Sequence, residues 1–481
     1  MKKNVCYNRV MITNAHYISI IITMSVVSLA GLYSARYVRT AADFSVGGRQ
    51  MGSALVGGSL IGSFVGGTST IGTAQLAYQY GISAVWFTLG GGLACLALGL
   101  FLVRPLRERE VDTVPQFLAV TYGDSVRPWV ALYTSLGMFV QIAAQSLSAI
   151  PLLTSLFPIS SQLAAVVFTV VLITYVVFGG FWGASLVGIL KTALIYFTLF
   201  AAGCLSLKLL GGYYGTRQSF PVIPWFSMFP GGLAKELASG FSVILGFIST
   251  QTYLQPVFAA KNVRSARRGL FFAGLLIPLA GFTSAIIGLY MRSAYPGMEP
   301  GGALPVFFIR HLNPWLGGAA LATLLVSLVL TGASLSLSVG IILAQDIYMR
   351  LRPRAKAREI LLSSRLLVLF VGVLSLLFVL FNMNTLILKW AFLSMTLRGV
   401  TVFVPLMGAI FIANRINAAS GLAAIIVAPL AALLWAFFLP LSAADPLYVG
   451  ICLSITFLVG GAVWGGKKGC GKRGVRPMTH D

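Results

Sequence analysis

Hydroxyl side chains recur along one apolar segment at the spacing of a helix face. Ser327, Thr331, Ser334 and Ser338 follow one another at intervals of four, three and four residues, which places them on one side of a helix. Neutral oxygens suit a hard cation such as sodium at a depth where a buried carboxylate would be costly. The alternative is that each hydroxyl bonds back to its own helical turn.

A second polar cluster interrupts the apolar segment 56–72. Glycine and hydroxyl residues fill the run Gly66–Thr70 in the middle of that segment. Unpaired backbone is very costly in hydrocarbon, so such a cluster indicates a helix that breaks where it lines a cavity. A broken helix presents free carbonyl oxygens, and an ion can use them as ligands.

Two basic residues stand inside apolar segments, where an ionisable side chain is a functional candidate. Lys191 could mimic a bound cation or carry a coupling proton, because burial disfavours its charge; alternatively, it reaches toward the cytoplasmic surface. Arg398 could pair with a substrate carboxylate, or contact loop carbonyls and water in an outer vestibule. Gln141 and Gln145 could line the same cavity, although packing between helices explains them equally well.

The elements that must hold these residues are membrane helices. Hydrophobic residues make up 58% of the 481 and charged residues 9%, and the mean hydropathy is +0.90, far from soluble globular usage. A span needs about 20 apolar residues. Thirteen spans are expected, at 12–33, 54–77, 82–103, 129–153, 162–178, 184–210, 238–255, 269–291, 315–343, 363–381, 387–412, 421–440 and 447–464.

The basic residues predict the orientation of these spans. Lys and Arg gather in alternate loops, which the positive-inside rule assigns to the cytoplasm of a plasma or inner membrane. The N-terminus is then outside and residues 465–481 form a basic cytoplasmic tail beside anionic lipid headgroups, with a mild conflict at Lys2, Lys3 and Arg9. The net charge of +23 therefore reflects topology, and we expect no nucleic-acid partner and no obligate protein partner.

The acidic residues and histidines argue against catalysis. All eleven carboxylates, Asp346 among them, fall in loops or at the ends of the expected spans, so no carboxylate proton relay crosses the membrane. His16, His311 and His480 are far apart, and there is no paired carboxylate or zincin spacing. We expect a protein that is not an enzyme. A transporter-like membrane sensor is a further alternative, but such proteins usually carry an output domain.

Five short motifs are spread along the chain, and both their residues and their order carry information about its family. They are the stretch 43–49, the loop 106–123, Gly179-Gly180, the stretch 255–269 and Asp346-Ile347-Tyr348. Together they resemble the sodium/solute symporter family, which includes carriers for proline, pantothenate and sugars. The resemblance implies a secondary active transporter that works by alternating access, with sodium-coupled symport of a small organic solute.

The same resemblance implies an all-α membrane protein with the leucine-transporter-like fold. Residues 1–481 would form a single transporter domain. Its core, 51–412, would hold ten helices in two inverted five-helix repeats. An extra N-terminal helix at 12–33 and two peripheral helices at 421–464 would flank this core.

Matching to the family pattern gives sodium as the coupling ion and names its ligands. Ser327 and Thr331 match ligand positions of that family, and Gly62 and Val65 match positions whose backbone carbonyls complete the sodium shell there. An inverted repeat also predicts a second discontinuous helix in the other half. The span 238–255 fits this expectation, with Thr250 and Gln251 near the substrate site.

The substrate positions depart from those of sugar carriers. Thr68 and Ser69 match substrate-facing positions where sugar carriers have glutamate and glutamine, and Thr88 stands where they have a third-span carboxylate. A sugar is therefore not expected. Together with Gln145 and Arg398, these positions favour a small organic acid or an amino acid-like solute.

The sodium-site pattern is also incomplete. Leu330 stands where many family members carry a second hydroxyl ligand, and Gly188 stands where many carry an aspartate. Lys191 follows three residues later, and some carriers of the wider fold replace sodium with a lysine ammonium. A sodium-independent or proton-linked carrier that uses Lys191 is therefore the main alternative.

Overall fold

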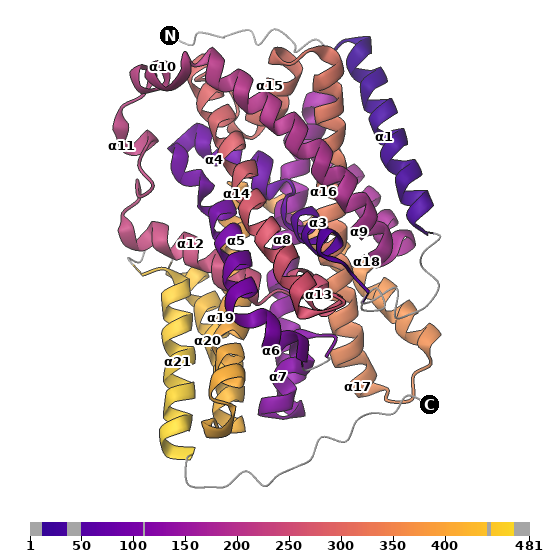
Figure 1. The fold of residues 1–481 in the computed structure, drawn as a ribbon, viewed down its shortest axis with the longest axis vertical. Coiled ribbons are helices and arrows are strands. Elements are labelled where there is room, and N and C mark those ends of the chain that lie inside the picture. The colour runs from indigo at the N-terminus through magenta and orange to yellow at the C-terminus, as the bar shows by residue number, and fades with distance from the viewer. Residues whose placement is uncertain (1–11, 36–49, 109–110, 440–443, 466–481) are drawn as a thin grey trace.

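The computed structural model describes residues 12–35, 50–108, 111–439 and 444–465, and these form a bundle of helices (Figure 1). Over residues 30–35, 178–187, 213, 216–217, 357, 414 and 464–465 it describes the helical backbone but not the side chains. The helices are α1 (Asn14–Ala35), α3 (Ser53–Phe64), α4 (Thr73–Tyr80), α5 (Trp86–Ala97), α6 (Val103–Glu108), α7 (Val114–Tyr122), α8 (Arg127–Leu156), α9 (Ser161–Leu209), α10 (Gly212–Ser219), α11 (Val222–Trp225), α12 (Leu233–Ile248), α13 (Gln251–Phe258), α14 (Val263–Ala294), α15 (Ala303–His311), α16 (Pro314–Leu343), α17 (Met349–Leu351), α18 (Ala357–Asn382), α19 (Ile387–Phe411), α20 (Ala418–Phe438) and α21 (Pro446–Gly465).

Every expected span has a counterpart among these helices. In the described part of the chain, nine helices are long and apolar enough to cross a membrane, and two further spans are pairs of helices bent at a break. Two shorter apolar segments, Asn14–Leu29 and Ser161–Val177, account for the rest. The expected spans 162–178 and 184–210 both lie in α9, without the interruption that was expected between them. The chain is a multi-pass membrane protein.

Some expectations fall on residues outside the described ranges. These are the basic tail after 465, the residues Lys2, Lys3 and Arg9, and the family-like stretch 43–49.

The bundle has a buried centre and a lipid-facing rim. In the most apolar stretch of each helix, 83% of α8 and 89% of the helix that begins with α16 are buried, against 28% of α18 and 22% of α21. Large apolar side chains such as Leu366 and Phe370 are exposed on α18, as expected for a helix that faces lipid. Residues that carry chemistry must therefore be sought on α8 and α16 and on the helices they touch.

Two membrane-spanning helices break inside the described part of the bundle. The first break follows Phe64, and α3 makes an angle of 62° with the segment Thr68–Tyr80. The second separates α12 from α13, which meet at 44°. Both breaks were expected, and they occur in the spans predicted to begin the two inverted repeats. Broken helices are tolerated at this depth only where other groups satisfy the freed backbone.

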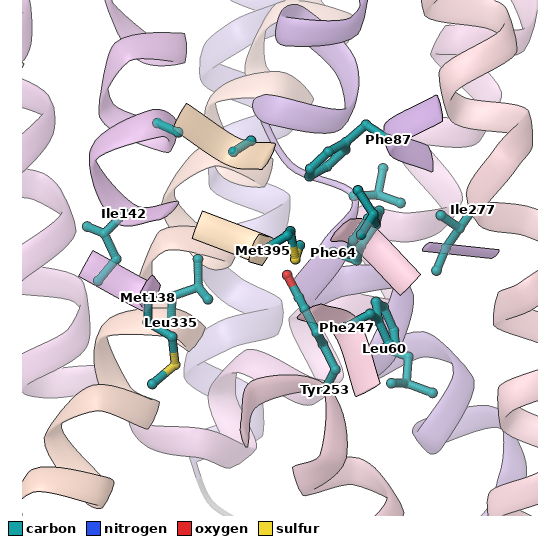
Figure 2. Close-up of a cluster of buried hydrophobic side chains, with 14 of the residues drawn as sticks. Leu60, Phe64, Phe87, Met138, Ile142, Phe247, Tyr253, Ile277, Leu335 and Met395 are labelled. Atoms are coloured by element: carbon teal, nitrogen blue, oxygen red, sulfur yellow. The ribbon is translucent and has the colours of Figure 1, made fainter. Parts of the chain in front are cut away.

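Aromatic rings join the two breaks (Figure 2). Phe64 ends the first half of one broken helix, while Phe247 and Tyr253 flank the break in the other. The ring centroids of Phe247 and Tyr253 are 4.3 Å apart with nearly parallel planes, and Phe64 lies 5.4 Å and 5.6 Å from them. Such pairs add to the free energy of burial, so the two breaks are packed as one unit.

Close packing of α12 on α19 gives a first prediction. A methyl group built on Gly246 would lie 2.5 Å from the carbonyl oxygen of Met395, and backbone cannot yield as a flexible side chain does. We expect Gly246→Ala to lower the free energy of unfolding by about 1–3 kcal/mol, measured as a lower melting temperature in detergent. Gly460→Ala on α21 is the control, because no atom lies within 4 Å of the added methyl group. Equal melting temperatures for the two variants would contradict this packing.

Candidate functional site

Side chains stabilise the first break and leave two of its carbonyl oxygens free to bind elsewhere. The N–H of Gly66, which would reach the carbonyl of Gly62 in a regular helix, donates instead to Ser69 Oγ at 2.8 Å. The N–H of Gly67 donates to Gln145 Oε1 at 2.8 Å. The carbonyls of Gly62 and Val65 consequently turn toward neighbouring helices.

The Lys191 ammonium lies at these carbonyls. Its Nζ donates to the Gly62 oxygen at 2.6 Å, to Thr331 Oγ1 at 3.0 Å and to the Ser327 carbonyl at 3.3 Å. Ser327 Oγ also donates to the Val65 oxygen at 2.8 Å. An ammonium has three donors and no acceptor, so its hydrogen bonds are complete. The structure thus brings together all four residues predicted to hold sodium, with a cation from the protein among them.

The alternative that Lys191 reaches the cytoplasmic surface is wrong, because the side chain is fully buried. Glycine at 188 allows this arrangement: a methyl group on Gly62 would lie 3.2 Å from Gly188 Cα, so α9 approaches α3 closely. Leu330 packs in an apolar cluster with Val27 and Val326. Neither position that departs from the family pattern supplies an oxygen here.

The hydroxyl side chains on α16 contact two different elements, the first break and the second. Ser327 and Thr331 face the first break, as described above. Ser338 Oγ accepts from Thr252 Oγ1 of α13 at 2.9 Å, beside the second break. Ser334 Oγ instead donates to the Leu330 carbonyl of its own helical turn at 2.9 Å. For this residue the alternative that the hydroxyl bonds back to its own turn is confirmed.

A chain of polar side chains connects the two breaks. Gln141 and Gln145 of α8 each donate to Thr68 Oγ1 at 3.2 Å. Arg398 Nη2 donates to Gln141 Oε1 at 3.4 Å, and its Nη1 donates to Thr250 Oγ1 at 2.8 Å. Four of the residues predicted to face the substrate therefore belong to one hydrogen-bonded set, which Gln141 completes.

Arg398 is the centre of this set. Its side chain is fully buried, and Nε and Nη2 bond the Ser394 carbonyl and hydroxyl at 3.1 Å and 2.8 Å. A methyl group on Gly137 would lie 2.6 Å from Arg398 Cγ, so glycine lets the arginine stem lie across α8. The Tyr253 hydroxyl also faces the guanidinium. The alternative position of Arg398 in an outer vestibule is wrong, because all of these partners are buried.

The structure does not bring three other predicted residues into this set. Thr88 Oγ1 donates to Val85 O at 3.1 Å and lies against Gly281 of α14. Gln251 turns toward α7, where it donates to the Asp112 carbonyl at 2.7 Å and accepts from the Val114 N–H at 2.9 Å. Ser69 serves the break itself through the Gly66 N–H. Sequence spacing could not assign these side-chain directions.

A buried ion pair at the end of α16 was missed. The sequence predicted that Asp346 lies in a loop or at a span end, but a π-helix, Ala344–Tyr348, continues the span, and the carboxylate is fully buried. Asp346 Oδ1 accepts from Arg127 Nη2 at 2.8 Å, and Oδ2 accepts from Thr113 Oγ1 at 3.0 Å. Gln251 of α13 bonds the backbone of Asp112 and Val114, the two neighbours of Thr113. Together these contacts bring the start of α7, the start of α8, the start of α13 and the end of the α16 span into one place.

The amide of Gln145 supports the second prediction. Gln145→Leu keeps the size of the side chain but removes the acceptor for Gly67 N–H and a donor to Thr68. A buried backbone donor without a partner costs about 1–3 kcal/mol, so we expect a clearly lower melting temperature in detergent. The control is Gln162→Leu at the exposed beginning of α9. A Gln145→Leu protein as stable as this control would show that the amide does not support the break.

Comparison with known proteins agrees with these features. The model of the sodium:solute symporter family matches residues 44–428. The osmoregulated proline transporter OpuE of Bacillus subtilis is 23% identical over an alignment of 446 positions that covers 87% of this chain and 89% of that protein. Human sodium/myo-inositol cotransporter 2 is 24% identical over 352 residues, and there the match covers 64% of this chain and 52% of the cotransporter.

Solved structures show the same fold. A structure described as the substrate-bound outward-open state of a Na+-coupled sialic acid symporter has a TM-score of 0.78 at 18% identity, over 94% of this chain and 97% of the other. An inward-facing structure of Mhp1 has a TM-score of 0.54 at 13% identity, over 87% and 92%. The fold is the all-α leucine-transporter-like fold with its inverted repeats. This chain belongs to the sodium:solute symporter family, and it is a membrane transporter rather than an enzyme.

Proposed function

We propose that this chain is a carrier of a small organic solute in which the Lys191 ammonium takes the place of a coupling sodium ion. One observation carries the proposal: Nζ lies 2.6 Å from the Gly62 carbonyl and 3.0 Å from Thr331 Oγ1, two of the oxygens that the family pattern assigns to sodium. Transport of the solute would then not depend on sodium at this site.

A sodium ion and the ammonium compete for the same oxygens. The carbonyl of Gly62 already accepts from both Lys191 and Thr331 Oγ1, so a metal ion would have to displace the lysine. Two positive charges at contact distance in a poorly polarisable interior also repel strongly. Sodium-coupled symport, which family membership favours, therefore requires Lys191 to lose its proton or move away. A proton-linked cycle would use the same two states of the lysine.

Alternating access would use the two breaks and the cytoplasmic contacts near them. The Asp346–Arg127 ion pair and the hydrogen bond from Gln251 to the Asp112 carbonyl hold α7 against α8, α13 and α16. These contacts would close the cytoplasmic side of the carrier. Solute and cation shift such an equilibrium only through their different affinities for its states. The loop charges favour an outer N-terminus and a cytoplasmic C-terminus in the plasma or inner membrane.

The proposal predicts how sodium acts on a lysine variant. In Lys191→Ala the Gly62 carbonyl, Thr331 Oγ1 and the Ser327 carbonyl lose their cation, and sodium can replace it. We expect sodium chloride to raise the melting temperature of this variant in detergent, relative to choline chloride at equal ionic strength. The melting temperature of the unaltered protein should be the same in both salts.

The matched control is Lys208→Ala, at the exposed end of the same helix α9, which should respond as the unaltered protein does. Uptake into proteoliposomes under an imposed sodium gradient provides a second measurement. Sodium stabilisation of the unaltered protein, or uptake that follows the sodium gradient, would reject the lysine-based carrier and leave sodium-coupled symport.

A further inference from the structure

We propose that the solute is a small carboxylate and that Arg398 is its binding partner. This inference rests on the proposed function only in requiring that the chain binds and carries a solute. It does not depend on which cation lies at the first break. It assigns the substrate class from the charge balance of the buried core.

Within the described residues, no carboxylate balances the charge of Arg398. The hydrogen bonds of its guanidinium go to neutral groups: Thr250 Oγ1, Gln141 Oε1, the Ser394 carbonyl and hydroxyl, and Met395 Sδ. Among the residues that the structure describes, no Asp or Glu forms an ion pair with it. A buried charge without an opposite charge is costly even when hydrogen-bonded. An anion is the partner that this site lacks.

The rest of the core makes the imbalance larger. Lys191 is a second fully buried cation with neutral partners only. The carboxylate of Asp346 is buried as well, but it is already paired with Arg127. A neutral solute would leave both positive charges uncompensated, and a cationic solute would add to them. A solute that carries a carboxylate could pair with Arg398, and one with a net negative charge would also reduce the net charge of the core.

The position of Arg398 suits a solute site rather than a peripheral contact. It bonds Thr250 at the second break and, through Gln141, reaches Thr68 at the first. A carboxylate held by the guanidinium fork would therefore contact both broken helices at once. The fork matches the two oxygens of a carboxylate, and the Phe247–Tyr253 stack supplies an apolar wall beside it.

A purely structural role is the alternative that the experiment must separate. In that role Arg398 ties α8, α12 and α19 together, and its loss would weaken the protein regardless of the charge of any solute. The two roles differ in selectivity. An anion receptor prefers an acid to the amide of the same shape and loses that preference when its cation is removed, whereas a purely structural arginine predicts neither result.

The test is a thermal-shift titration of the purified full chain with matched pairs: acetate and acetamide, L-lactate and L-lactamide, L-proline and L-prolinamide, together with myo-inositol. We expect at least one acid to raise the melting temperature while its amide and myo-inositol do not. In Arg398→Gln this acid should bind about 30-fold more weakly or not at all, the loss typical when one partner of a buried charge pair is removed.

Two controls keep the test decisive. Arg398→Lys keeps the charge and should retain the preference for the acid, with weaker binding, whereas Arg268→Gln on the exposed surface should bind as the unaltered protein does. If Arg398→Gln does not fold, the acid–amide comparison on the unaltered protein still decides. Equal binding of acid and amide, binding of myo-inositol alone, no response to any acid, or an acid preference that survives in Arg398→Gln would each overturn the assignment. The sodium response of Lys191→Ala needs no solute, so the two proposals fail independently.

Discussion

The hydrogen bond from Lys191 to the Gly62 carbonyl is the interaction on which the centre of this protein depends. The break after Phe64 exists because Ser69 and Gln145 take the N–H groups of Gly66 and Gly67, and that exchange leaves the Gly62 oxygen without its helical partner. The ammonium supplies the missing donor at 2.6 Å. It also bonds α16, so one side chain connects α3, α9 and α16 at the point where α3 lacks a helical hydrogen bond.

Neutral oxygens surround both buried cations, and this shapes the whole core. Arg398 and Lys191 are held by hydroxyl, amide and carbonyl groups on helices that must also pack through apolar side chains. The aromatic rings of Phe64, Phe247 and Tyr253 lie between the two broken helices (Figure 2) and exclude water from the polar groups nearby. Low polarisability strengthens every hydrogen bond in this region and raises the cost of any unbalanced charge.

The sequence predicted what local patterns encode. The run Gly66–Thr70 predicted the first break, because a cluster of glycine and hydroxyl residues in the middle of a span indicates a helix that breaks where it lines a cavity. Helical spacing predicted that Ser327 and Thr331 share a face, and hydropathy located the spans. Whether Lys191 reaches the surface or the carbonyls depends on how closely α9 approaches α3, a distance that no single-sequence pattern contains. The Asp346–Arg127 pair joins residues far apart in the chain, so a single sequence could not predict that the two side chains lie within contact distance.

The second break has a consequence for how binding is communicated. Thr250, which accepts a hydrogen bond from Arg398, is joined by one peptide bond to Gln251, which holds the backbone on both sides of Thr113. Thr113 in turn donates to the buried Asp346. A molecule that draws the guanidinium away from Thr250 would therefore disturb the contacts of Gln251 with the backbone around Thr113 through adjacent atoms of the main chain. The effect of binding at Arg398 could therefore begin to reach Thr113 before any whole helix rotates.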